Sequence, residues 1–204
     1  MTSAMAIDPR LGSVSPPGVQ VGTEVELRFN GSRLDDAQEI LFYKKGFQVL
    51  KIEEKSAGFV RVKVKVTADC PLGEHPVRVR TAGGITELKT FYVGPFPVVD
   101  RVKPKDGEPP QKLPLNCTIA SSVPNESQEI FTVDAKKGQR LSAEIESMRL
   151  GRGFYDPYIE ILDTKGFILS RSDDTKLFIQ DCYASAVVPL DGTYTIKVRE
   201  TSYG

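Results

Sequence analysis

The chain has 204 residues, with 27 lysines and arginines against 27 aspartates and glutamates, so its formal net charge is zero. This balance gives no indication of binding to nucleic acid or to an anionic membrane, and we expect no nucleic acid partner. No run of about 18 apolar residues is present, so we expect no membrane insertion. The hydrophobic fraction of 40% argues against a disordered chain and is enough for one or two packed domains.

Residues 1–11 are expected to be a lead-in, and they lack the basic and apolar regions of a signal peptide. After them, residues 25–29 and 60–66 alternate apolar with charged side chains, which is typical of half-buried strands. Turn residues such as Pro71 to Gly73 separate such segments. Short strands at this spacing predict a β-sandwich domain over residues 12–94.

Residues 100–114 carry four prolines among charged residues, which predicts a stiff linker that we place over residues 95–112. A second domain is expected over residues 113–204, with Leu115–Val123 as its first strand. Residues 131–133 and 194–198 alternate again, with one apolar face and with Gly and Asp turns around them. The whole chain is therefore predicted to be all-β, with two β-sandwich domains.

Several short motifs follow one another in order through the second domain. They are Ala135-Lys136-Lys137-Gly138-Gln139, Asp156-Pro157, Asp163 with Gly166, Ser172-Asp173-Asp174 and Pro189-Leu190-Asp191-Gly192-Thr193-Tyr194. In this order and spacing they resemble the bacterial pre-peptidase C-terminal (PPC) domain of exported proteases and other large secreted proteins. The resemblance implies a jelly-roll-like sandwich. It also implies one further strand, so we expect the second domain to be truncated at its C-terminal end and the chain to be a fragment of a longer protein.

The first domain carries a second set of short motifs. They are Pro17-Gly18 before Gly22-Thr23, Asn30-Gly31 with Leu34, Pro71-Leu72-Gly73 before Val77-Arg78-Val79, and Phe91-Tyr92-Val93. This set is similar to the IPT/TIG family of immunoglobulin-like domains. The pair of domains resembles a tandem in large exported proteins of planctomycete-type bacteria. This implies a secreted protein, extracellular or periplasmic, although no signal peptide is present in this chain.

The residue types needed for catalysis are sparse. His75 is the only histidine, and no G-x-S-x-G motif is present. A cysteine nucleophile needs a basic partner, and His75 would have to reach Cys117 or Cys182 in the other domain. Glu144 and Glu146 are expected on an outer strand face without a cleft. The chain is therefore predicted not to be an enzyme.

Basic side chains form a stripe along two predicted strands, at Arg61, Lys63, Lys65, Arg78 and Arg80. One interpretation is a surface for anionic polysaccharide. The other is an ordinary solvated face, in which Glu24 and Glu26 on a neighbouring strand form cross-strand ion pairs with the basic residues. We favour the second interpretation, because surface charge on strands is common.

Two pairs of residues in the second domain are candidates for binding or cross-linking. Tyr155 and Tyr158 are ligand-binding candidates, as a stacking platform for a sugar or a collagen-like polymer; the alternative is that they pack in the core. Cys117 and Cys182 are the candidate disulfide, because they share a domain, whereas Cys70 does not. Such a bond requires Cα atoms within about 7 Å.

We expect no cofactor other than, at most, a calcium ion in the second domain. Calcium binds carboxylate and carbonyl oxygens and needs neither histidine nor cysteine. The candidate metal ligands are Asp156, Asp173, Asp174 and Asp181. Loops at one end of a sandwich can bring such residues together. The alternative is that Asp156 caps a turn while Asp173 and Asp174 are solvated or pair with Arg171 or Lys176.

These observations predict non-catalytic β-sandwich modules of a larger exported bacterial protein. Their role would be spacing, stabilisation or adhesion, with a polysaccharide or protein surface as partner. The alternative is a calcium-assisted module that binds carbohydrate or matrix protein and is attached to a secreted hydrolase or peptidase.

Overall fold

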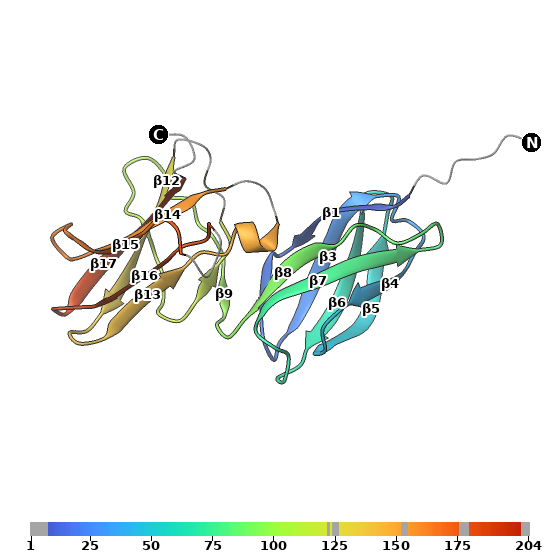
Figure 1. Cartoon of the computed structure of the whole chain (residues 1–204), viewed down its shortest axis with the longest axis horizontal. Coiled ribbons are helices and arrows are strands. Elements are labelled where there is room, and N and C mark those ends of the chain that lie inside the picture. The colour runs from blue at the N-terminus through green and yellow to red at the C-terminus, as the bar shows by residue number, and fades with distance from the viewer. Residues whose placement is uncertain (1–7, 122, 124–126, 152–154, 176–179, 201–204) are drawn as a thin grey trace, which may run out of the picture. The chain divides into compact units, whose positions relative to one another are not determined.

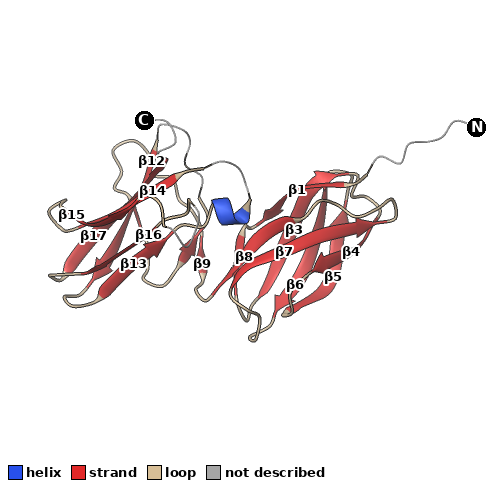
Figure 2. Cartoon of the chain, viewed as in Figure 1, coloured by secondary structure: helices blue, strands red, loops and turns tan. Residues whose placement is uncertain are grey.

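The computed structural model describes residues 8–121, 123, 127–151, 155–175 and 180–200. The chain divides into two compact units, Met1–Val98 and Val99–Gly204 (Figure 1). Strands make up nearly all the regular structure of the described residues (Figure 2), so the predicted all-β fold is confirmed. No helix in the described ranges has the length and apolarity needed to cross a membrane.

Two four-stranded sheets build the first unit. One has the strand order β1-β3-β6-β5 and the other β2-β8-β7-β4. Neighbouring strands are antiparallel, except for the parallel pair β2 and β8. The strands are β1 (Arg10–Ser15), β2 (Gly18–Gln20), β3 (Glu24–Ser32), β4 (Ala37–Phe42), β5 (Phe47–Lys55), β6 (Phe59–Val66), β7 (Gly73–Thr81) and β8 (Lys89–Gly94).

The core of the first unit is formed by the apolar face that the sequence pattern predicts. Leu27 and Phe29 on β3 and the alternate valines of β6 are fully buried, whereas Lys63 and Lys65 between those valines are exposed. They form one cluster with Val77 and other residues of the second sheet. Burying each such side chain contributes about 1.5–3 kcal/mol, so this cluster holds the two sheets together.

The strand β5 was not predicted, because its sequence gives no regular alternation. Most of its side chains are exposed, and its register with β6 shifts after Val49 and after Ile52. It lies at the edge of its sheet. An edge strand that buries little apolar surface has no periodic pattern to reveal it.

The second unit also packs one sheet on another. A five-stranded sheet has the order β10-β12-β17-β14-β15, and a two-stranded sheet pairs β13 with β16. Leu141 on β13 and Ala184 on β16 share a core with Phe131, Ile159 and Tyr194 of the larger sheet. The elements are β9 (Val98–Val99), β10 (Gln111–Lys112), β11 (Thr118–Ile119), β12 (Gln128–Ala135), β13 (Arg140–Glu144), the 3-10 turn η1 (Met148–Leu150), β14 (Pro157–Leu162), β15 (Ile168–Ser172), β16 (Tyr183–Val187) and β17 (Gly192–Glu200).

The expected first strand of this unit, Leu115–Val123, is much shorter in the structure. Only β11 is a strand there, and it pairs with β9. Asn116 has a φ of 56°, in the left-handed region that interrupts an extended strand. Of the expected range, residue 122 lies outside the described residues.

The segment predicted as a linker, residues 95–112, is partly built into the second unit. Val99 packs against that unit's core, and β10 pairs in parallel with β12. The Arg101 Nε–H donates to Glu129 Oε2 at 2.6 Å. A large part of the proline-rich segment is therefore anchored by side-chain and backbone contacts.

Candidate functional site

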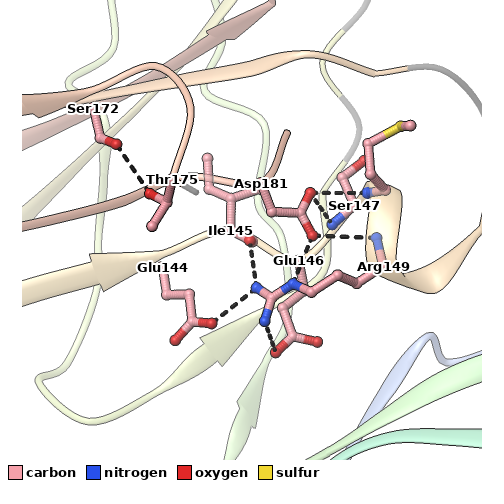
Figure 3. A network of polar contacts seen from close by, with 9 residues as sticks. Glu144, Ile145, Glu146, Ser147, Arg149, Ser172, Thr175 and Asp181 are labelled. Atoms are coloured by element: carbon pink, nitrogen blue, oxygen red, sulfur yellow. Dashed lines mark hydrogen bonds and ion pairs between the residues drawn. The ribbon is translucent and has the colours of Figure 1, made fainter. Parts of the chain in front are cut away.

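A network of polar contacts in the second unit includes Asp181, which is fully buried (Figure 3). Its Oδ1 accepts the backbone N–H groups of Ser147 at 3.0 Å and Met148 at 2.8 Å. Its Oδ2 accepts the backbone N–H of Arg149 at 3.2 Å and the Arg149 Nε–H at 2.9 Å. These backbone groups belong to the start of η1, so the carboxylate fixes this turn in place.

Three carboxylates lie around the Arg149 guanidinium. Besides Asp181, its Nη2 donates to Glu144 Oε1 at 2.8 Å and to the Ile145 carbonyl at 3.0 Å, and its Nη1 lies 3.7 Å from Glu146 Oε1. Burial by itself lowers the pKa of Arg149, but the hydrogen bonds to Asp181 and Glu144 outweigh it and raise the pKa above its ordinary value. The Arg149 guanidinium therefore stays charged and forms charge-assisted hydrogen bonds with Asp181 and Glu144.

Sequence reasoning missed this network. Glu144 and Glu146 were expected side by side on an outer strand face, but β13 ends at Glu144 and the Glu146 side chain is mostly buried beside Arg149. The only local signal was an arginine directly before Leu150-Gly151. The partner, Asp181, lies 32 residues away from Arg149, and alternation within a strand cannot indicate such a pairing.

The four predicted calcium ligands are placed differently from one another. Asp173 and Asp174 are exposed just after β15, and Asp156 is half-buried directly before β14. Burial raises the pKa of the Cys182 thiol to about 12, and the charges of Asp181, Asp173 and Asp156 add to this effect. Three of the four carboxylates thus act electrostatically on one buried thiol.

The set of four does not fit a calcium ion as a whole, because the oxygens of Asp181 already accept four N–H donors. Over the described ranges, no group of three or more His, Cys, Asp or Glu is placed to hold a metal ion. Calcium binding by Asp156, Asp173 and Asp174 stays a prediction.

The two predicted ligand-binding tyrosines are half-buried. The Arg199 guanidinium on the adjacent strand lies 4.3 Å from the centre of the Tyr158 ring, and the Tyr158 hydroxyl donates to Glu160 Oε1 at 3.1 Å. Burial raises the pKa of Tyr155. One face of Tyr158 is therefore occupied by Arg199, as in a structural cation–π pair.

All three cysteines are free, so the structure contains no bond between Cys117 and Cys182. Cys70 Sγ lies 3.9 Å from His75 Nε2, within the core of the first unit. His75 is fully buried, and its Nε2–H donates to the Pro71 carbonyl at 2.6 Å. Burial raises the pKa of the Cys70 thiol, which disfavours the reactive thiolate, and it lowers the pKa of His75, which disfavours the imidazolium that would stabilise a thiolate.

The predicted cross-strand ion pairs of the basic stripe are confirmed. β3 pairs with β6, and Lys63 Nζ lies 3.1 Å from Glu24 Oε2 while Arg61 Nε lies 3.9 Å from Glu26 Oε1. Arg80 Nε lies 3.0 Å from Glu39 Oε2 on β4. These charges are largely neutralised on their own sheet, as on an ordinary solvated strand face.

Comparison with protein families gives a match to the first unit. Residues 8–90 match the family described as quinohemoprotein amine dehydrogenase, alpha subunit domain III. The match lies within the first unit and supports its β-sandwich, immunoglobulin-like fold. Among curated proteins, none matches this chain.

Solved structures give distant likenesses. SGBP-B of the Bacteroides ovatus mixed-linkage glucan utilization locus, in complex with a mixed-linkage heptasaccharide, is 9% identical with a TM-score of 0.34, covering 94% of this chain and 74% of that one. The Yersinia pseudotuberculosis adhesin InvE is 9% identical with a TM-score of 0.31, covering 92% of this chain and 50% of that one. The human OSCAR ligand-binding domain has 9% identity and a TM-score of 0.31, covering 88% and 81%.

Proposed function

We propose that this chain is a pair of non-catalytic β-sandwich modules from a larger exported bacterial protein, acting in spacing, stabilisation or adhesion to a surface polymer or a partner protein. In this proposal the first unit is an IPT/TIG-like module and the second a PPC-like module, in an extracellular or periplasmic location. The family match to a domain of a dehydrogenase subunit concerns residues 8–90 alone.

The observation that carries the proposal is the state of the one histidine. His75 is fully buried in the first unit, and its Nε2–H donates a hydrogen bond to the Pro71 carbonyl at 2.6 Å. General acid–base chemistry needs a group that reaches a substrate proton. Asp181, a fully buried carboxylate, likewise accepts hydrogen bonds from the start of η1 and from Arg149. Both groups serve the fold, which supports a binding or spacing role.

An array of bacterial surface polysaccharides and matrix proteins tests this proposal. We expect the whole chain to bind saturably to one class of polymer or protein on the array. The amount of that polymer or protein on the array should stay constant over time. Absence of binding to every class would leave spacing as the role. Loss of the captured polymer during incubation would contradict a non-catalytic module.

The alternative function is calcium-assisted recognition through the second unit. Two observations favour this alternative. Asp173 and Asp174 are exposed just after β15, and the charges of Asp156 and Asp173 both raise the pKa of the Cys182 thiol. Calorimetric titration of metal-stripped protein with calcium, beside an Asp173→Ala/Asp174→Ala variant, tests it. Binding heat that the double variant loses would support the alternative, and no heat at millimolar calcium would end it.

A further inference from the structure

One end of the second unit is formed by three turns that lie against one another. The Lys137 N–H donates to Asp191 Oδ1 at 2.8 Å, and a Cβ atom placed on Gly192 would lie 2.5 Å from Thr164 Cγ2. Figure 1 shows these turns together at the ends of β12, β14 and β16. We call this surface the hairpin end; it comprises the turns at residues 136–139, 163–167 and 188–191 and the strand ends that adjoin them.

Large apolar side chains are exposed at the hairpin end. They are Phe167 (68% exposed), Val187 (53%), Leu190 (53%) and Ile168 (48%). The Ser185 N–H donates to Ser170 Oγ at 3.2 Å, which sets β16 beside β15 and brings Val187 and Ile168 to the same end. Single exposed apolar side chains are ordinary, but a group of four on adjoining turns and strand ends indicates a contact surface.

The turn that carries Phe167 is held in one conformation by its own polar groups. Asp163 Oδ1 accepts the N–H groups of Lys165 and Phe167, both at 2.8 Å, and the Asp163 N–H donates to the Phe167 carbonyl at 2.8 Å. Gly166 has a φ of 88°, which suits glycine in this turn. Because the turn is already ordered, placing Phe167 in an apolar environment costs little additional backbone entropy.

Cations outnumber carboxylates at the hairpin end. Its basic residues are Lys136, Lys137, Arg140 and Lys165, and all four are exposed. Its acidic residues are Asp163, which accepts two backbone N–H groups, and Asp191, which accepts one. The nearby Asp134 pairs with Lys112, whose Nζ lies 2.5 Å from its Oδ2. The surface therefore presents apolar side chains beside an excess of positive charge.

We propose that the hairpin end is a peripheral docking surface for an anionic phospholipid bilayer. Apolar side chains flanked by lysines enter the boundary between headgroups and acyl chains, while the lysines contact the lipid phosphates. The chain would bind at the surface of the bilayer without crossing it. This inference goes beyond the proposed function and does not depend on it. An acidic polysaccharide would neutralise the lysines but would leave Phe167, Leu190 and Val187 in water. The exposed apolar group thus favours lipid over polysaccharide.

The chain contains no tryptophan, so Phe167→Trp places a single fluorescent reporter at the hairpin end. We expect its emission to shift to shorter wavelength when vesicles of phosphatidylcholine with about 30% phosphatidylglycerol are added, because the indole leaves water. Phosphatidylcholine vesicles alone should give a much smaller shift. The matched control is Leu72→Trp, on an exposed turn of the first unit, whose emission should not move. Equal shifts for both reporters, or no shift for Phe167→Trp, would overturn the proposal.

Vesicle co-sedimentation measures how much the lysine charges contribute to membrane binding. The Lys136→Gln/Lys137→Gln/Lys165→Gln variant should partition about 100-fold more weakly onto the anionic vesicles, at about 1 kcal/mol for each lysine. The control Lys51→Gln/Lys103→Gln/Lys105→Gln removes the same charge from exposed lysines elsewhere and should bind like the unmodified chain. A similar loss in both variants would contradict a local site. Retention of the chain by polygalacturonate, with no binding to the vesicles, would replace lipid with an acidic polysaccharide as the partner and overturn the proposal.

Discussion

At the scale of single residues, His75 is a buried titratable group with a predictable effect. Its imidazole packs against two aromatic rings. The centre of the imidazole lies 4.9 Å from the ring centre of Phe47 and 6.1 Å from that of Phe91. Burial lowers its pKa in the folded state, whereas the unfolded chain titrates near the ordinary value of about 6.5. Below that pH the unfolded state therefore binds more protons than the folded state.

We predict that the first unit loses stability as the pH falls from about 6.5 toward the lower folded pKa of His75. Above pH 6.5 this contribution is constant, because the imidazole is neutral in both states. Thermal melting at pH 7.5 and 5.5 measures the loss. The control His75→Phe removes the ionisable group and keeps an aromatic ring, so its loss between the two pH values should be smaller. An equal loss in both proteins would show that His75 does not titrate as its burial implies.

Asp181 gives a second prediction at this scale. Asp181→Asn removes the charge opposite Arg149 and places amide hydrogens against backbone N–H donors, so the second unit should lose about 3 kcal/mol of unfolding free energy. Glu144→Gln is the matched control. Its side chain is 37% exposed, and we expect less than about 1 kcal/mol. Urea denaturation measures both, and equal losses would contradict the role assigned to Asp181.

At the scale of elements, the Arg101–Glu129 ion pair is one of the contacts that anchor the segment before β10. Arg101 and Glu129 side chains are 17% and 11% exposed, and the guanidinium carbon lies 5.3 Å from the Phe131 ring centre. A hydrogen bond to a charged group of this kind contributes about 1.5–3 kcal/mol.

We predict that Arg101→Met, which keeps the apolar stem, destabilises the second unit by about 2 kcal/mol. It should also increase proteolytic cutting within residues 99–112. The control Lys112→Met breaks an exposed pair with Asp134 in the same segment and should change neither property measurably. An Arg101→Met protein that melts and digests like the unmodified chain would show that the segment is held by other contacts.

Sequence alternation predicted the strands that bury one face most accurately, and it was less successful for exposed or short strands. It located β3, β6, β12 and β17, because core packing imposes a period of two on them. It missed β5, which is exposed, and it overextended β11, where Asn116 adopts a positive φ. The Asp181–Arg149 network and the meeting of three turns at the hairpin end depend on contacts between distant residues. A strand pattern carries no information about those contacts.

At the scale of the whole molecule, the two cores are separate. One cluster joins residues from Leu11 to Val93, and the other joins residues from Leu113 to Ile196. Domains with independent cores unfold as independent cooperative units unless a large interface couples them. We therefore expect calorimetry to resolve two transitions, with Asp181→Asn lowering one and leaving the other unchanged. A single transition that shifts as a whole would contradict independent units.

We propose above all that this chain acts in spacing, stabilisation or adhesion and does not break covalent bonds. The most direct measurement incubates it with isolated bacterial envelope polymer and follows bound protein, new reducing ends and new amino groups over time. Our account predicts binding that saturates, with no release of either product beyond a buffer control. Release that grows linearly with time and with protein concentration would contradict it.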